Sequence, residues 1–145
     1  MPGTNVYAEL FRLTKPIFEG ASHRRIVSLL AKNSCTLLKA RASLVLECLE
    51  DGLKLCPAGS YNISAAYQSV ATKDIAVARA ACEQKKALLI KDVRKLYQTT
   101  DKKTARTIAA EGVVSLVSVP MIHDGDVIGC INLYFSRSLQ RIEAK

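Results

Sequence analysis

The most regular apolar pattern lies near the C-terminal end, where two strand-like segments, 113–122 and 126–135, flank a short polar turn. Both alternating faces of the second segment are largely apolar, which is typical of a central strand covered on each side. Asp124-Gly125 suits a two-residue turn, because both positions need a positive φ angle. Gly129 indicates a bulge or a close backbone approach, and Pro120 predicts a bulge or break because proline cannot donate to a ladder. We therefore expect an antiparallel hairpin.

Helical spacing dominates the N-terminal part of the chain. An apolar pattern over residues 5–19 is interrupted by Pro16, which predicts that a first helix stops or kinks there. A second apolar stripe predicts a helix over about 22–37, with Ser22 as its N-cap. The members of this stripe are Ile26, Leu29, Leu30, Asn33 and Leu37.

Strand signals follow this helix. Segments 42–49 and 53–58 are apolar and flank the turn residues Asp51 and Gly52, which predicts a second hairpin. An irregular stretch of small and polar residues covers 59–73. Segment 87–93 has the composition of a buried strand.

Two more helices are expected between these strands and the C-terminal hairpin. Asp74 or Thr72 is placed to cap a helix that ends near Lys86, and Asp101 is placed to cap one that Gly112 ends. The resulting order of elements predicts an α+β (mixed α/β) fold on an antiparallel-rich sheet. We expect one domain over residues 1–145.

Composition limits the class of protein. Hydrophobic residues make up 49% of the 145-residue chain, enough for a real core. The apolar runs are strand-sized and far short of the ~20 residues of a membrane span, and the N-terminal residues lack a signal-peptide pattern. Five cysteines form no Cys-x-x-Cys pair and no metal-ligand spacing with histidine. We expect a cytoplasmic protein without membrane contact, bound metal or cofactor, whose cysteines are mostly small buried side chains.

The net charge is +8, and basic residues are concentrated in one stretch. They are Lys85, Lys86, Lys91, Arg94, Lys95, Lys102, Lys103 and Arg106. Such a stretch attracts anions, but its one aromatic residue, Tyr97, and the absence of a nucleic-acid-binding signature speak against nucleic acid. A solvated basic flank is the favoured interpretation, followed by an anion at the mouth of a pocket.

Four sequence segments together resemble a known family, the GAF domains. The segments 111–122 (EGVVSLVSVPMI) and 124–134 (DGDVIGCINLY) look like the closing hairpin of that family. Segment 87–93 (ALLIKDV) resembles its strand ending in Asp-Val, and segment 37–43 (LLKARAS) its junction between helix and first strand. The likeness runs from about residue 23 to residue 137.

The resemblance implies a GAF/PAS-like central antiparallel sheet of five or six strands with helices on both faces. One face would be roofed by the loop and helices between Gly59 and Gly112, and in relatives the ligand sits under that roof. The candidate ligand-binding residues carried over by position are Tyr61, Ile63, Tyr67, Ile75, Arg79, Cys82, Asp92, Thr104, Ile108, Leu116 and Ser118. Arg79 and Asp92 are the favoured polar contacts, because a pocket needs a few convergent polar groups. Asp92 could instead cap the loop after its strand.

The family likeness, without a catalytic constellation, favours a sensory or regulatory domain that binds an unidentified small molecule in signal transduction. The helix over 22–37 and the tail over 138–145 are expected to form a homodimer face, and an output domain or partner protein would receive the signal. One alternative is a thiol-based reductase of free methionine sulfoxide, with Cys82 as nucleophile and Cys130 or Cys56 resolving. Another is an interaction or dimerisation module with an empty pocket.

Overall fold

The fold is described by a computed structural model for residues 23–49, 54–98 and 101–139. The expectations for a first helix over 5–19, for Ser22 as an N-cap and for the turn at Asp51 and Gly52 lie outside these residues. Within them, no helix is long and apolar enough to cross a membrane.

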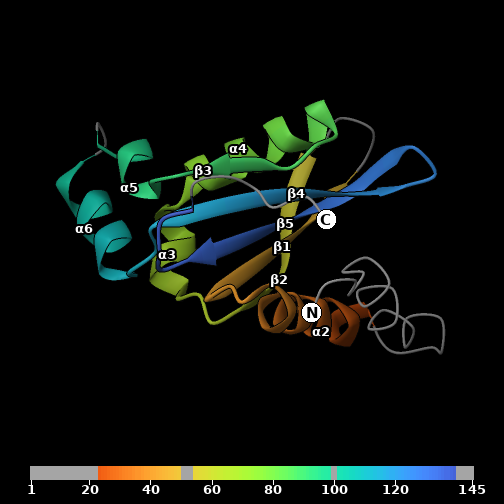
Figure 1. The fold of residues 1–145 in the computed structure, drawn as a ribbon, viewed down its shortest axis with the longest axis horizontal. Coiled ribbons are helices and arrows are strands. Elements are labelled where there is room, and N and C mark those ends of the chain that lie inside the picture. The colour runs from red at the N-terminus through yellow and green to blue at the C-terminus, as the bar shows by residue number, and fades with distance from the viewer. Residues whose placement is uncertain (1–22, 50–53, 99–100, 140–145) are drawn as a thin grey trace.

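An antiparallel five-stranded sheet forms the centre of the described residues, which confirms the expected α+β fold (Figure 1). The strands are β1 (Ala42–Leu49), β2 (Lys54–Tyr61), β3 (Leu88–Ile90), β4 (Ser115–His123) and β5 (Asp126–Phe135). Their order is β2-β1-β5-β4-β3, so β1 and β5 are flanked by strands on both sides.

The hairpin of β4 and β5 forms as the sequence predicts. Asp124 and Gly125 have φ angles of 50° and 82°, the positive values that a tight turn requires. The register shifts between Met121 and Ile122, one residue beyond Pro120, where a bulge or break was expected. A Cβ atom added to Gly129 would lie 2.4 Å from the carbonyl oxygen of Leu46, so glycine permits the close approach of β5 to β1.

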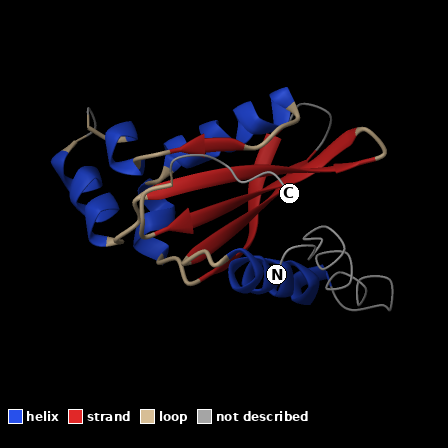
Figure 2. Ribbon diagram, viewed as in Figure 1, coloured by secondary structure: helices blue, strands red, loops and turns tan. Residues whose placement is uncertain are grey.

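Helices lie along both sides of the sheet, as Figure 2 shows. Helix α2 (His23–Leu38) packs against β1 and β2 on one face. The other face is covered by what we call the roof, namely α3 (Ala65–Val70), α4 (Thr72–Gln84), α5 (Val93–Leu96) and α6 (Lys102–Ala110). Separate apolar clusters fill the two sides, so the sheet divides the core into an α2 side and a roof side.

The buried face of α2 differs from the expected one. The residues that are fully buried are Val27, Ala31, Ser34 and Cys35, whereas the predicted stripe is only half-buried. Small side chains let the helix lie close to the sheet, and a Cβ atom on Gly59 of β2 would lie 2.5 Å from a methyl group of Val27. Close packing, rather than side-chain size alone, decides which face of the helix is covered.

Candidate functional site

The roof side of the core contains a group of buried polar side chains, which we call the Asp74 network. Its members come from α3, α4, the end of α5, and strands β4 and β5, and each is at most 1% exposed. They are Tyr67, Asp74, Tyr97, Ser118, Asn132 and Tyr134. Buried polar groups are expensive unless they are hydrogen-bonded, so their partners decide what the network can do.

Asp74 is the centre of the network. It lies in the first turn of α4 with its carboxylate directed inward, and Ala71 occupies the N-cap position without a side-chain hydrogen bond. The expectation that Asp74 or Thr72 caps the helix is therefore wrong. The Tyr67 hydroxyl donates to Asp74 Oδ2 and the Tyr97 hydroxyl donates to Oδ1, each at 2.7 Å. Two phenols thus replace the backbone N–H groups that a capping carboxylate would bind.

Tyr97 and Tyr134 complete the surroundings of the carboxylate. The phenolic oxygen of Tyr97 also accepts the backbone N–H of Asp74 at 3.2 Å. Tyr134, on β5, is hydrogen-bonded with Asp74 and with Asn132. The rings of Tyr67 and Tyr134 meet edge to face, with centroids 5.6 Å apart and planes at 80°. This is a preferred geometry for an aromatic pair.

Asn132 and Ser118 connect the network to the sheet. The Ser118 hydroxyl donates to Asn132 Oδ1 at 2.6 Å across the β4–β5 pair. Asn132 Nδ2 in turn donates to the carbonyl oxygen of Asp74 at 3.4 Å. The start of α4 is therefore hydrogen-bonded to the middle of the sheet.

The surroundings of Asp74 have opposing effects on the pKa of its carboxyl group. Burial raises the pKa of its carboxyl group above the usual value, while the hydrogen bonds from Tyr97, Tyr67 and Tyr134 act to lower it. Burial, followed by the charge of Asp74, raises the pKa of Tyr67 and of Tyr97, so both phenols stay protonated and can donate. Both carboxylate oxygens lie 2.7 Å from a phenol hydroxyl, so the phenols stabilise the ionised form, which burial disfavours.

Helix α3, which carries Tyr67, is held in place by a contact with Glu111. The Glu111 carboxylate accepts from the backbone N–H of Ser64 at 2.9 Å and from its hydroxyl at 2.6 Å. Ser64 Oγ also accepts from the backbone N–H of Tyr67 at 3.0 Å and so caps α3. One acidic side chain at the end of α6 therefore fixes the helix that brings Tyr67 to Asp74.

The structure brings together seven of the residues expected at the site on the roof side of the sheet. Those on the roof side are Ile63, Tyr67, Ile75, Cys82, Ile108, Leu116 and Ser118, and all but Ile63 and Ile75 are fully buried. Of these, Tyr67 and Ser118 belong to the Asp74 network.

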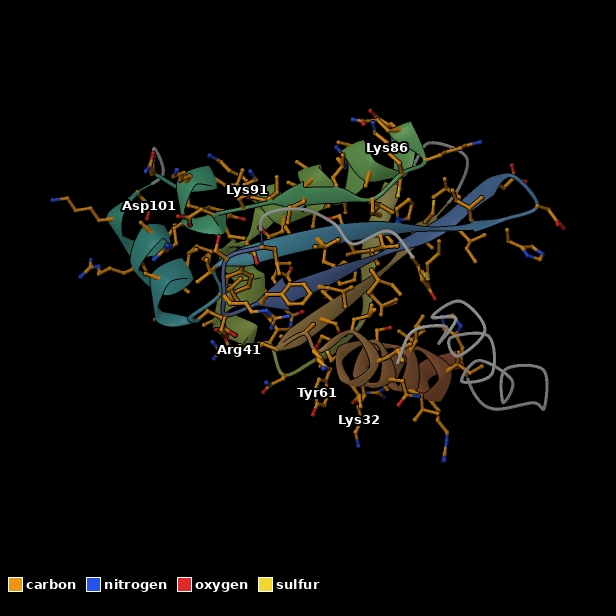
Figure 3. All side chains as sticks on the ribbon, viewed as in Figure 1. Lys32, Arg41, Tyr61, Lys86, Lys91 and Asp101 are labelled. Atoms are coloured by element: carbon orange, nitrogen blue, oxygen red, sulfur yellow. The ribbon has the colours of Figure 1, made fainter. Side chains whose placement is uncertain are left out.

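The other expected residues lie apart from the network. Tyr61 is 39% exposed, and in Figure 3 it is near the lower edge of the molecule, far from Lys91 and Asp101. Arg79 is exposed on α4. Asp92 caps α5, the alternative named for it, and it forms an ion pair with Arg94 at 2.9 Å. The Thr104 hydroxyl donates to Asp101, the predicted cap of α6, at 3.0 Å.

Sequence reasoning missed most of the network. The local patterns indicate Asp74 only as a helix cap, Tyr97 only as an isolated aromatic in a basic stretch, and Tyr134 only as a strand residue. Asn132 offered the clearest signal, because it is a polar residue inside an otherwise apolar central strand. A buried amide of this kind requires polar partners, and those partners lead to Asp74.

Cys82 and Cys130 are neighbours between α4 and β5. The Cys82 thiol donates to the carbonyl oxygen of Gly129 at 3.7 Å, and the Cys130 thiol donates to Asn132 Oδ1 at 3.9 Å. Burial raises the pKa of both thiols, which keeps them protonated at neutral pH. A catalytic thiol needs the opposite environment, partly exposed and near positive charge. Among the described residues, no three His, Cys, Asp or Glu side chains are grouped so as to hold a metal ion.

The comparisons with known proteins agree with this architecture. The family model of the GAF domain matches residues 22–144, and the chain belongs to this family. None of the curated proteins matches the sequence significantly.

Solved structures of low sequence identity share the fold. The GAF domain of a phosphoenolpyruvate-protein phosphotransferase from Coxiella burnetii is 13% identical, with a TM-score of 0.66 over 99% of this chain and 84% of that one. A domain of a putative two-component sensor histidine kinase from Sinorhizobium meliloti is 13% identical, with a TM-score of 0.61 over 86% and 80%. The phycocyanobilin-bound GAF domain of a cyanobacterial phytochrome is 14% identical, with a TM-score of 0.58 over 97% and 85%.

Proposed function

We propose that this GAF domain is a sensory or regulatory module that binds a small molecule under its roof, at the Asp74 network, within the cytoplasm. The observation that carries the proposal is a fully buried carboxylate with hydrogen-bonding neighbours in the middle of an otherwise apolar cluster. A pocket that recognises a ligand needs this combination of apolar walls and a few convergent polar groups.

The free-energy cost of the network supports a functional role. Apolar side chains of similar volume are often at least as stabilising as buried charges, even where the charges are paired. Perturbed titratable groups in such a position are more frequent at functional sites than elsewhere. One of the similar structures is a bilin-bound GAF domain, so the fold is able to hold a small molecule.

The connections of the network provide a way to pass on a binding event. Tyr67 lies on α3, which Glu111 ties to α6, and the backbone of Asp74 is hydrogen-bonded to Asn132 of the sheet. A ligand that contacts Asp74 therefore affects α3, α4 and β5 together. The change would reach a partner protein or output domain through the displaced roof or through the helical face.

Ligand screening tests the proposal. The protein is examined by native mass spectrometry for a co-purified molecule and by thermal shift against nucleotides, amino acids, amines and organic acids. A molecule at 100 times its Kd stabilises the native state by about 2.7 kcal/mol, so the melting temperature rises. The Asp74→Asn variant should lose this rise, whereas Asp92→Asn, at a carboxylate outside the network, should keep it.

Two outcomes would overturn the proposal. Stabilisation that is the same in the Asp74→Asn variant would place the ligand elsewhere on the molecule. No stabilisation by any compound, with nothing bound in the mass spectrum, would favour the interaction module, in which Tyr67 fills the site permanently.

The reductase alternative receives less support. Cys82 and Cys130 are adjacent, as a nucleophile and a resolving thiol must be, but both are at most 1% exposed and are held protonated. Turnover of methionine sulfoxide that disappears in the Cys82→Ser variant would reinstate it.

A further inference from the structure

The carboxylate of Asp74 has no positively charged partner in the part of the chain that the structure describes. Its hydrogen bonds come from phenols, and none of the ion pairs includes it. A buried carboxylate is normally paired with a cation, because desolvation is costly for an isolated charge. Neutral hydroxyls compensate this cost only in part, since hydrogen bonds between ions are stronger. A positive charge placed beside Asp74 would therefore offset more of this desolvation cost than the phenols do.

Three tyrosine side chains lie next to this carboxylate and meet it with their hydroxyl groups. Tyr67 and Tyr134 stand nearly perpendicular to one another, at 80°, and Tyr97 contributes the third phenol. The face of an aromatic ring carries partial negative charge and attracts cations. A ring face that became accessible beside Asp74 would add to the attraction for a cation.

Lys73 already makes a contact of this kind at the border of the network. Its ammonium nitrogen lies 5.8 Å from the centroid of the Tyr97 ring and donates to the carbonyl oxygen of Leu96 at 2.7 Å. This distance is within the range of an attractive cation–π interaction. The ring of Tyr97 therefore contacts the ammonium group of Lys73, which lies outside the network. None of the described ammonium groups forms an ion pair with the Asp74 carboxylate.

We infer that the ligand of the Asp74 network carries a positively charged nitrogen group, an ammonium, amidinium or guanidinium. This inference rests on the proposed function and specifies the chemical class of its ligand. The N–H groups of the cation would donate to Asp74, and its carbon framework would lie against the tyrosine rings.

Tyr67 is the donor that such a ligand would replace. It lies on a six-residue helix whose Ala65, Ala66 and Ser69 are exposed, and the side chain of Glu111 anchors the start of this helix. Movement of α3 would remove the Tyr67 hydroxyl from Asp74 Oδ2 and open a space the size of a phenol ring. A ligand N–H group would then take the free acceptor, so that no buried lone pair loses its partner.

An anionic ligand does not fit this position. It would bring a second negative charge beside Asp74, where the low dielectric strengthens the repulsion. Lys73, at the border of the network, is already engaged by the Leu96 carbonyl oxygen and the Tyr97 ring, and basic side chains such as Lys91, Lys102 and Lys103 are exposed on the outer surface. Figure 3 shows Lys91 and Asp101 of this basic region at the outer end of the roof.

Matched probes test the charge preference. Benzylammonium, benzyl alcohol and benzoate share a ring and differ in charge, and their Kd values are measured by calorimetry on the wild type, Tyr67→Ala and Tyr67→Phe. Tyr67→Ala leaves a ring-sized space beside Asp74, and Tyr67→Phe removes only the competing hydroxyl. In each of the three proteins that binds a probe, we expect the Kd of benzylammonium to be at least about tenfold lower than that of benzyl alcohol. Benzoate is expected not to bind. In Tyr67→Ala/Asp74→Asn the difference between ammonium and alcohol should disappear.

The results separate this inference from the proposed function. If benzyl alcohol or benzoate binds as tightly as benzylammonium, or if Asp74→Asn leaves the preference unchanged, the inference is overturned and the proposed site stands. If no probe binds to any of the three proteins, and the wider compound screen is also negative, both are overturned. Circular dichroism of each variant identifies any that fails to fold. If Tyr67→Ala does not fold, the Kd values of the three probes are compared in Tyr67→Phe.

Discussion

At the residue scale, the tyrosines of the network have acidities that differ strongly between the folded and unfolded chain. Burial and the charge of Asp74 raise the pKa of Tyr67, Tyr97 and Tyr134 above the value of about 10 that a free phenol has. In the unfolded chain the same phenols lose their protons near that value. The folded protein therefore holds more protons than the unfolded chain in alkaline solution.

This difference predicts a loss of stability at high pH. The contribution of the tyrosines is fully present below pH ~10 and is lost as the pH rises above it, because only the unfolded chain releases the protons. Each buried tyrosine steepens the fall in unfolding free energy by about 1.4 kcal/mol per pH unit. Urea denaturation between pH 8 and 11 measures the slope, which Tyr97→Phe should make shallower. Tyr61→Phe, at an exposed position, serves as the control, and equal slopes in both variants would contradict the prediction.

Asp74 also shows how far a single position can be interpreted from sequence. An aspartate at the start of a helix is normally a cap, and that rule is correct for Asp92 and Asp101. It fails for Asp74 because two phenols offer hydrogen bonds inside the core and the carboxylate turns toward them. Their presence depends on chain segments 7 and 23 residues away, which no local pattern reveals.

At the element scale, the long elements follow their sequence patterns and the short ones do not. Strand β1 spans the predicted residues, and β4, β5, α2, α4 and α6 lie within a few residues of their expected bounds. Helices α3 and α5, of six and four residues, are too short to give a periodic signal. Strand β3 ends at Ile90 rather than near residue 93, because Asp92 caps α5 and the chain leaves the sheet there.

The contact between Glu111 and Ser64 predicts a local effect on α3. Glu111→Ala removes the acceptor of two hydrogen bonds, which should favour opening of α3 by about 1–2 kcal/mol. Hydrogen exchange of Ala65–Val70 is expected to accelerate roughly five- to thirtyfold, while the exchange of β1 and β5 stays unchanged. Mass-spectrometric exchange measurements check this result. Glu83→Ala, an exposed acidic residue on α4, is the matched control.

At the scale of the whole molecule, the outer side of α2 is the surface to consider. Ile26, Leu29 and Leu37 are half-buried and belong to neither apolar cluster of the described residues. Since α2 buries its small residues against the sheet, these larger side chains remain partly uncovered. We propose that this side of α2 forms a homodimer interface, in line with what the family resemblance implies for the helix.

Light scattering after gel filtration tests the dimer. We expect the wild type to have twice the chain mass at micromolar concentration, and Leu29→Glu to shift it toward the monomer because a charge would enter an apolar contact. Ser28→Glu adds the same charge at an exposed position of the same helix and should leave the mass unchanged. A monomeric wild type, or an equal effect of both substitutions, would show that this side of α2 is not the interface.

The sequence by itself determined the hairpins and the order of the long elements. Alternation of side chains and turn chemistry are properties of neighbouring residues, so a local pattern is enough to predict them. The tertiary structure decided which side of α2 is buried and which polar groups meet at the roof. Asp74 is brought to Tyr67, Tyr97 and Tyr134 by the packing of α3, α4 and α5 on β5, over separations that periodicity does not describe. Hydrogen-bond satisfaction in the core is settled only when the whole chain is folded, because each buried group depends on partners from distant segments.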